Sequence, residues 1–369
     1  ARQNQILIHP FASRERKRWQ PVKWGEVIYG LLKSDDSTYI KIIGSSSDEK
    51  AVQEILRAEL LEGFQNRIEN LAGKVKFSGL TTIFERSKCF IGHDSVNAHI
   101  AAFTNTPSII VSLGSVRPHE TAPYSDNSIV LAPRTKCFPC FPDDNCDYYL
   151  CHHDIRYSDV LNAYESLVGD RPIETSLSVN LYRPSFDKEC GLTLKCENKE
   201  TTSIKDCFKD FYKLYWLLYI GDREARVDLP TINSLTASHL MNYLAGLESL
   251  HELYRFGETY SNYIHVESNA SNPSSEKIQE YSAKVGEVDE LATKLKGTFP
   301  LLSPIVDFFH VQRSNLEGST LVEVATASKI SYGDAVRACS VIYELASGTL
   351  DGFRKENSSN SEKSIQGEI

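Results

Sequence analysis

Residues 88–112, with the sequence KCFIGHDSVNAHIAAFTNTPSIIVS, contain two short apolar runs on either side of a helical pattern. The runs Cys89–Gly92 and Ser108–Ser112 have the length and composition of buried strands, and Asn97–Thr104 between them suits a helix. Strands joined through a helix normally pair in parallel, because the crossover returns the chain to the same edge of the sheet. The stretch therefore predicts a β–α–β unit of a parallel sheet.

The same alternation covers residues 1–170. Further strands are predicted at Gln5–His9, Thr38–Ile43, Ile68–Leu71 and Ser128–Leu131, and further helices at Val22–Lys33, Glu49–Gly63 and Gly79–Ser87. Parallel sheets are covered by helices on both faces, so this region is predicted to form an α/β domain. In such folds ligands bind beyond the carboxyl ends of the strands.

The pattern changes after residue 171, where strand signals become scarce. Helical patterns dominate at Ser203–Ile220, Ser238–Phe256, Ser275–Lys296, Pro304–Gln312 and Tyr332–Ser347. We predict a mainly α-helical domain of unknown role over residues 171–355. Residues 356–369 are polar and lack aromatic side chains, a composition that favours a disordered tail.

Composition narrows the classes of function. The chain has 369 residues, a hydrophobic content of 41% and a formal net charge of −9, which suits two domains and argues against a nucleic-acid partner. The most apolar stretch, Tyr215–Gly221, is far shorter than the ~20 residues that span a bilayer. No secretory signal is recognised. We expect a soluble, cytoplasmic protein, and peripheral attachment to the inner membrane stays open.

A basic loop follows the first predicted strand. The cations between Arg14 and Arg18 stand out in an acidic chain and favour binding of one small anion, such as a phosphate. Ala12 and Ser13 are small enough for backbone N–H groups to approach an anion. Lys17 supplies a point charge, and Trp19 anchors the return of the loop. A solvated charged loop is the alternative interpretation.

A second loop lies in IGSSSDEKAVQEI, which starts at Ile43. A strand ends at Gly44, and a helix begins near Asp48 or Glu49. An acidic residue at this position can cap the helix, where the macrodipole favours it. It can equally bind the hydroxyl groups of a ribose. Both interpretations stay open.

A third loop lies in CFIGHDSVNAHIAA, where a strand gives way to a helix near Ser95. Asp94 or Ser95 suits the N-cap, and the free N–H groups of the first turn would bind a pyrophosphate. Asp94 could bind sugar hydroxyls beside it, and His99 lies one turn into the helix, within reach of a phosphate. A structural role for His99 is the alternative.

The stretch CFPCFPDDNCDYYLCHHD concentrates four cysteines: Cys137, Cys140, Cys146 and Cys151. Thiolates at this density could hold a structural Zn²⁺ or an iron centre, with His152 and His153 as substitute ligands. Reduced thiols and local disulfides are the alternatives. The other cysteines show no ligand spacing and are interpreted as buried or incidental thiols; they are Cys89, Cys190, Cys196, Cys207 and Cys339.

The ordered series IHPFASRERKRW, IIGSSSDEKAV and NLAGKVKFSGLTTIFERSKCFIGHDSVNAHIAAFTNTPSIIVSLG, followed by APY and CFPC, resembles glycosyltransferase family nine, the lipopolysaccharide heptosyltransferases. The resemblance covers about residues 5 to 165 and fits the carboxyl-terminal, donor-binding half of these enzymes. It implies the GT-B architecture, in which two Rossmann-like domains enclose the active site. It also implies an inverting reaction without a metal or other cofactor, with ADP-heptose as donor.

By motif position, the resemblance assigns roles to individual residues. Ser13 and Lys17 would contact the donor diphosphate, Glu49 would lie near the ribose, and Asp94 would hold the heptose hydroxyls. Ser95, the backbone at Val96 and Asn97, and the side chain of His99 would close around the phosphates.

Two departures concern glycine positions, because Phe11 and Val96 stand where the family usually has Gly, and Asn97 replaces a common Pro or Leu. A β-branched Val resists positive φ and close backbone approach. A third departure concerns the catalytic base, an acidic residue that the family carries in an amino-terminal acceptor domain. That domain would precede residue 1. The chain is then a fragment, the acceptor half comes from a partner chain, or the helical region replaces it.

The sequence thus predicts a transferase that moves a sugar, heptose by resemblance, from a nucleotide-diphosphate donor to a lipopolysaccharide or related glycan, free or lipid-linked. The first alternative is a non-catalytic module that keeps the donor fold and binds a partner through its helical region. The second is a heptosyltransferase that modifies a protein acceptor.

Overall fold

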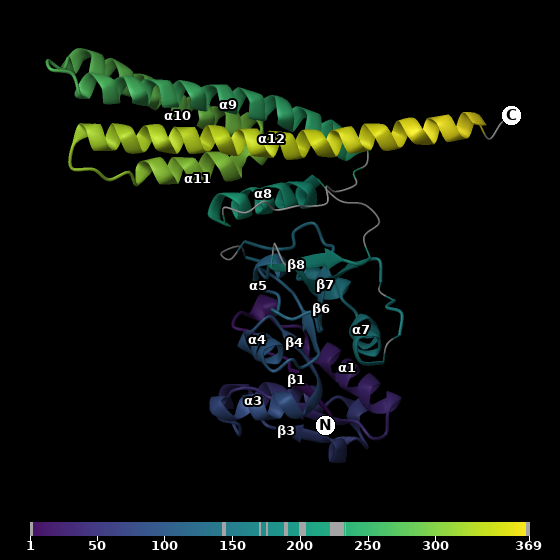
Figure 1. The fold of residues 1–369 in the computed structure, drawn as a ribbon. Coiled ribbons are helices and arrows are strands. Elements are labelled where there is room, and N and C mark those ends of the chain that lie inside the picture. Colours follow the sequence, from purple (N-terminus) through teal and green to yellow (C-terminus); the bar gives the residue numbers. More distant parts are fainter. Residues whose placement is uncertain are drawn as a thin grey trace. The chain divides into compact units, whose positions relative to one another are not determined.

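The computed structural model describes residues 3–366 apart from 142–144, 170, 175, 188–190, 199–203, 222–231 and 233. The chain divides into two compact units, Ala1–Lys199 and Glu200–Ile369 (Figure 1). Each unit is described by itself.

The first unit is built on one eight-stranded sheet, in the order β3-β2-β1-β4-β5-β6-β7-β8. Its strands are β1 (Gln3–His9), β2 (Tyr39–Ile42), β3 (Ile68–Asn70), β4 (Ser87–His93), β5 (Ser108–Val111), β6 (Ser128–Pro133), β7 (Val179–Asp187) and β8 (Gly191–Cys196). The first six pair in parallel, and their order is that of a Rossmann-like sheet. The predicted α/β fold and its six parallel strands are confirmed.

Helices cover both faces of the parallel sheet (Figure 1). They are α1 (Pro21–Ser34), α2 (Glu49–Leu56), α3 (Phe77–Arg86), α4 (Val96–Phe103), α5 (Pro118–Thr121), α6 (Leu150–Asp154) and α7 (Tyr157–Gly169). Short 3₁₀ helices lie at Glu15–Lys17, Ser46–Asp48, Glu59–Leu61 and Gln65–Arg67.

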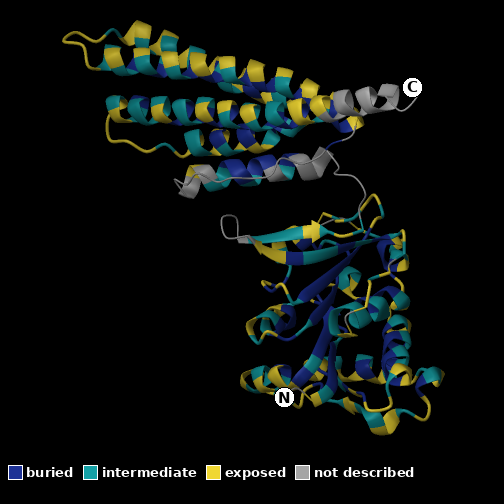
Figure 2. Cartoon of the chain, turned by 45° about the vertical axis from the view of Figure 1, so that its right-hand side comes forward, coloured by how far each residue is buried: buried dark blue, intermediate teal, exposed yellow. Residues whose placement is uncertain are grey.

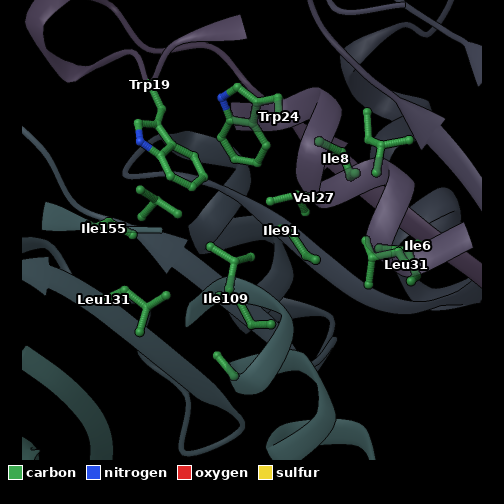
Figure 3. Packing of buried hydrophobic residues seen from close by; sticks show 14 of the residues in the cluster. Ile6, Ile8, Trp19, Trp24, Val27, Leu31, Ile91, Ile109, Leu131 and Ile155 are labelled. Atoms are coloured by element: carbon green, nitrogen blue, oxygen red, sulfur yellow. The ribbon is translucent and has the colours of Figure 1, made fainter. Parts of the chain in front are cut away.

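Side chains of one strand serve two separate cores, because neighbouring residues point to opposite faces. Ile6 and Ile8 belong to the larger core, which includes Trp24 and Leu31 of α1 (Figure 3). Leu7 lies between them in the chain and belongs to the core on the other face, with residues of α3 and α4. Each fully buried aliphatic side chain contributes about 1.5–3 kcal/mol. The buried strands form the centre of the unit in Figure 2.

The sheet continues beyond the boundary expected from the sequence. The strand β7 pairs antiparallel with β6, from Val130 with Tyr182 to Pro133 with Val179, and β8 pairs antiparallel with β7. The first unit therefore extends to Lys199, whereas the sequence placed its end at residue 170. A hairpin that belongs to the sheet was assigned to the helical region.

The second unit is helical, as predicted. Its helices are α8 (Ile204–Gly221), α9 (Ser234–Ser268), α10 (Ser275–Thr298), α11 (Ser303–Ser314) and α12 (Leu321–Gln366), with a 3₁₀ helix at Pro300–Leu302. Aromatic residues of α8 that are described, such as Phe208 and Tyr215, are buried in its core. The predicted disordered tail differs, because α12 continues to Gln366. None of the helices in the described parts of the chain is both long and apolar enough to cross a membrane.

Candidate functional site

Three loops lie at the carboxyl edge of the parallel sheet, after β1, β2 and β4. The neighbours β2, β1 and β4 run in the same direction, so their following loops share one edge. These are the three loops in which the sequence analysis found candidate residues.

The loop after β1, residues 10–20, contains the basic cluster and is called the basic loop. Its middle forms the 3₁₀ helix Glu15–Lys17, and Arg18 Nε donates to the carbonyl oxygen of Ala12 at 2.6 Å. The Trp19 side chain is buried, and its Nε1–H donates to the carbonyl oxygen of His152 at 3.1 Å. Trp19 therefore anchors the loop, in agreement with the sequence prediction.

A buried imidazole fastens the basic loop to the sheet. The backbone N–H of Trp19 donates to Nε2 of His93 at 2.9 Å, and Nδ1 of His93 lies 2.9 Å from the carbonyl oxygen of Val111. Since Nε2 accepts, Nδ1 carries the hydrogen. Burial lowers the pKa of His93 to about 3, although the bond to Val111 opposes this shift. His93 is therefore neutral at physiological pH.

The loop after β5 supports the basic loop from the other side. Gly114 has φ +62°, and a Cβ at this position would lie 2.7 Å from the carbonyl oxygen of Arg16. That oxygen also lies 2.9 Å from Nε2 of His152. Gly114 satisfies both requirements, because it tolerates positive φ and leaves room for the neighbouring backbone.

In the loop after β2, the two acidic residues take different positions. Asp48 forms a capping box with Ser45, accepting hydrogen bonds from its backbone N–H at 2.8 Å and from its hydroxyl at 2.6 Å. Glu49 begins α2 and is exposed. The capping interpretation thus applies to Asp48, and the carboxylate of Glu49 faces solvent.

The structure also accounts for Phe11, one of the departures from the family pattern. Its side chain is only 6% exposed, and a Cβ on Gly44 would lie 2.9 Å from Cε2 of Phe11. Phe11 therefore packs between the loops after β1 and β2, against a glycine that makes room for its ring. The Phe11 substitution changes the packing below the edge of the sheet.

In the loop after β4, Asp94 interacts with the basic loop and with α4. Burial raises the pKa of Asp94, while the nearby charge of Lys17, a hydrogen bond with the Thr121 side chain and the charge of His99 act in the opposite direction. Lys17, Asp94 and His99 therefore lie within electrostatic reach of one another. Thr121, at the end of α5, is a further neighbour that the sequence analysis missed.

The first turn of α4 contains polar groups without a protein partner. Ser95 is the N-cap residue with extended backbone, and its side chain makes no capping bond. Within the described residues, the buried Ser95 Oγ and Asn97 Oδ1 have no hydrogen-bond partner. Val96 is the first helical residue and its side chain is 56% exposed, so its β-branched side chain fits without positive φ. The first N–H groups of a helix have no partner within the helix, so the anion site predicted at this turn stays a prediction.

The predicted site residues are thus only partly brought together. Asp94 lies two residues before α4 begins, and the charges of Lys17 and His99 both reach its carboxyl and lower its pKa. Ser13 is exposed in the basic loop, and Glu49 is exposed at the start of α2. These two positions lie on the same sheet edge, and their roles stay predictions.

The expected metal site at the cysteines finds no support. Among the described residues, no group of three or more His, Cys, Asp or Glu side chains is arranged to hold a metal ion. Cys137, Cys140, Cys146 and Cys151 form no disulfide, and burial raises the pKa of Cys151 to about 11. The thiol alternative fits best, since Cys151 bonds the backbone of Gly114, which the Cys140 N–H also contacts at 3.0 Å.

Of the remaining cysteines, Cys89 and Cys339 are buried thiols, as expected, and Cys196 is a half-buried one. Cys190 lies outside the described residues, and the side chain of Cys207 is not described.

Comparison with known proteins gives matches in the first unit. Residues 1–148 match the profile of glycosyltransferase family 9 (heptosyltransferase). The chain is 34% identical over 129 residues to lipopolysaccharide heptosyltransferase 3 of Escherichia coli, which covers 34% of this chain and 36% of the relative. It is 30% identical over 157 residues to lipopolysaccharide heptosyltransferase 2 of Escherichia coli K12, covering 42% of this chain and 40% of the relative. The matches thus span less than half of these relatives.

Among solved structures, the chain is similar to the ADP-heptose lps heptosyltransferase II of E. coli. The identity is 25%, the TM-score is 0.38, and the match covers 46% of this chain and 47% of that one. The profile match and the curated relatives thus show that residues 1–148 of this chain are similar to glycosyltransferase family 9 (heptosyltransferase).

Proposed function

We propose that this chain provides the donor-binding half of a GT-B glycosyltransferase, which transfers heptose from a nucleotide-diphosphate donor such as ADP-heptose to a lipopolysaccharide or related glycan. The observation that carries the proposal is the group of Lys17, Asp94 and His99 beside the first turn of α4, within the family domain. A cation, a carboxylate and a helix N-terminus are the groups that a sugar diphosphate requires.

The diphosphate would lie between the basic loop and α4. Lys17 would contact one phosphate as a point charge, with Ser13 beside it in the same loop. The N–H groups of Val96 and Asn97 would bind the other phosphate at the positive end of the helix dipole. The unpartnered Ser95 Oγ supports this placement, because a phosphate oxygen would accept its hydrogen. His99, one turn into α4, would close the site.

The two carboxylates would bind the hydroxyl groups of the donor. Asp94, which lies within electrostatic reach of Lys17, would accept hydrogen bonds from the heptose. Glu49 would bind the ribose, since its carboxylate is exposed at the same edge of the sheet. This division gives the sugar and the nucleoside separate anchors on either side of the diphosphate.

Bond breaking at the anomeric carbon leaves negative charge on the departing diphosphate. Lys17 and the amide groups of α4 would stabilise that charge where it develops, which is the role of preorganised donors in transfer reactions. The acceptor hydroxyl would attack from the opposite face, with inversion, and lose its proton to a base on an acceptor domain or partner chain. Such a base typically contributes ~10²–10⁴-fold in rate.

Calorimetry of the chain with ADP, UDP and GDP tests the donor site. We expect ADP to bind more tightly than UDP or GDP. Lys17→Ala should weaken its binding by ~10- to 100-fold, the equivalent of about 1.5–3 kcal/mol for one charge-assisted bond. Arg86→Gln is the matched control, because Arg86 is exposed at the end of α3, before β4 begins at the opposite edge of the sheet. No binding of any nucleotide at millimolar concentration would contradict the proposal and favour a partner-binding module.

A further inference from the structure

A pocket with a volume of about 640 Å³ lies where the family match borders the β7–β8 hairpin. One wall comes from Arg117–Glu120 around α5 and another from the segment after β6 that contains Arg134 and Lys136. The third wall comes from Asn180 and Tyr182 of β7, which lies beyond the family match at residue 148. The hairpin of this chain thus completes a pocket that the family region alone leaves open.

The pocket is positively charged. Arg117, Arg134 and Lys136 line it together with one carboxylate, that of Glu120, which pairs with Arg117 at 3.3 Å. In the described part of the chain, no acidic side chain forms an ion pair with Arg134 or Lys136. Two cationic charges therefore remain available to a ligand.

Neutral partners fix the orientation of Arg134. Its Nε donates to Oδ1 of Asn180 at 2.9 Å, and its Nη2 donates to the carbonyl oxygen of Asn198 at 2.8 Å. These bonds hold the guanidinium on the hairpin and leave its charge uncompensated. A guanidinium that is held in place loses little side-chain entropy on binding a phosphate or carboxylate.

Aromatic rings lie next to these cations. The rings of His119 and Tyr182 meet edge to face with centroids 5.1 Å apart. The ring of Phe138 lines the pocket as well. Ligand pockets combine apolar and aromatic walls with a few polar groups in this way.

The pocket adjoins the proposed donor site through a single helical turn. Arg117 precedes α5 and Thr121 ends it, so the two Cα atoms are about 6 Å apart along the helix axis. Thr121 in turn lies close enough to Asp94, the proposed partner of the donor sugar, to lower the pKa of its carboxyl. A molecule bound in the pocket would therefore lie beside the sugar to be transferred.

We propose that this pocket binds an anionic group, a phosphate or a carboxylate, carried by the sugar acceptor. The inference rests on the proposed donor function and specifies the acceptor as a charged saccharide. Arg134 and Lys136 would hold its anion, and the ring of Tyr182 would pack against the saccharide beside it. The acceptor would thus be oriented by contacts from the chain's own hairpin.

Ligand-observed NMR with the full chain at saturating ADP tests the pocket. The probes are mannose 6-phosphate, glucuronic acid and, as neutral reference, mannose. We expect at least one anionic sugar to bind at least tenfold more tightly than mannose, and the pair of probes separates a phosphate site from a carboxylate site. Binding should weaken on raising the salt from 50 to 500 mM, because screening reduces exposed charge interactions.

Variants locate the binding. Lys136→Gln removes a charge without removing a hydrogen bond of the structure. It should weaken binding of the anionic probe several-fold. The double variant Arg134→Gln/Lys136→Gln should weaken binding of the anionic probe at least tenfold. The control variant Arg86→Gln should bind the probe as tightly as the wild type does. Anionic sugars that bind no better than mannose, or that bind Lys136→Gln and the double variant as well as the wild type, would overturn the inference. Parallel ADP titrations keep the two proposals distinct, because a failed donor site abolishes ADP binding and a failed acceptor pocket leaves it intact.

Discussion

The backbone N–H of Trp19 donates a 2.9 Å hydrogen bond to Nε2 of His93, which ties the end of the basic loop to the last residue of β4. Nδ1 of the same ring lies 2.9 Å from the carbonyl oxygen of Val111 at the end of β5. One buried imidazole thus links the basic loop to the ends of the neighbouring strands β4 and β5. The link depends on a neutral ring, because a proton on Nε2 would remove the acceptor and bury a charge.

This dependence predicts a loss of stability in acid. The pKa of His93 falls from 6.5 to about 3 on folding, so above pH 6.5 the ring is neutral in both states and has no effect. Below pH 6.5 only the unfolded chain takes up the proton, and the folded state loses about 2 kcal/mol by pH 5. His93→Gln keeps an acceptor for Trp19 and does not titrate, so its stability should depend less on pH.

Urea unfolding at pH 7.5 and pH 5, followed by Trp fluorescence in a Trp216→Phe background, measures this difference in the first unit. The stability deficit of His93→Gln relative to its parent should shrink by about 2 kcal/mol between the two pH values. Other histidines titrate equally in both proteins and cancel. His153→Gln, at an exposed position, should keep the parent's pH dependence. Parallel curves for His93→Gln and its parent would show that this ring is not the titrating group.

The roles proposed for Lys17 and Asp94 predict different binding profiles. Lys17→Ala should weaken ADP and ADP-heptose alike, because both carry the diphosphate. Asp94→Asn should weaken ADP-heptose by ~10-fold, as expected for a hydrogen bond to a charged group, and leave ADP unchanged or slightly tighter, since a negative charge near the phosphates is removed. Calorimetry with the two ligands measures both ratios. Equal losses for both ligands in Asp94→Asn would mean that Asp94 does not bind the sugar.

Gly114 allows a prediction on how the basic loop is supported. Gly114→Ala should destabilise the first unit by about 3 kcal/mol, because positive φ costs ~1–2 kcal/mol and the new Cβ meets the backbone at Arg16. Gly63 also has positive φ, +88°, but nothing lies within 4 Å of its Cβ position. Gly63→Ala should therefore show only the φ cost of ~1–2 kcal/mol. Urea unfolding separates the two, and ADP binding should fall only in Gly114→Ala.

The core of the first unit follows from the sequence because its strands are buried on both faces. Such strands appear as uninterrupted apolar runs, and β1, β4 and β5 were located within a few residues. The hairpin was missed for a related reason. The strand β7 mixes Asn180, Tyr182 and Arg183 with Pro184, and a proline within a run argues against a strand. Only pairing with β6 and β8 reveals it.

Some features of the candidate site can be predicted from the sequence, and others cannot. Topology brings the loops after β1 and β4 to one edge, so the proximity of Lys17 and Asp94 could be predicted from strand order alone. Thr121 could not, because a four-residue helix has no periodic pattern. The role of Gly114 depends on one φ angle and one distance to Arg16, neither of which leaves a trace in the sequence.

Helix α9 continues to Ser268, whereas the sequence pattern predicted its end at Phe256. The next residue, Gly257, lies inside the helix. Glycine lowers helix propensity, but a Cβ at Gly257 would lie 2.3 Å from Cε1 of the buried Tyr332 on α12. Gly257→Ala gains about 1 kcal/mol of propensity and loses ~1–3 kcal/mol through overpacking, so we expect a net loss of stability. At Gly286 of α10 nothing lies within 4 Å, and Gly286→Ala should stabilise by ~0.5–1 kcal/mol. Hydrogen exchange of the α9 and α10 amides measures both. A stabilised Gly257→Ala would mean that α9 and α12 do not pack this closely.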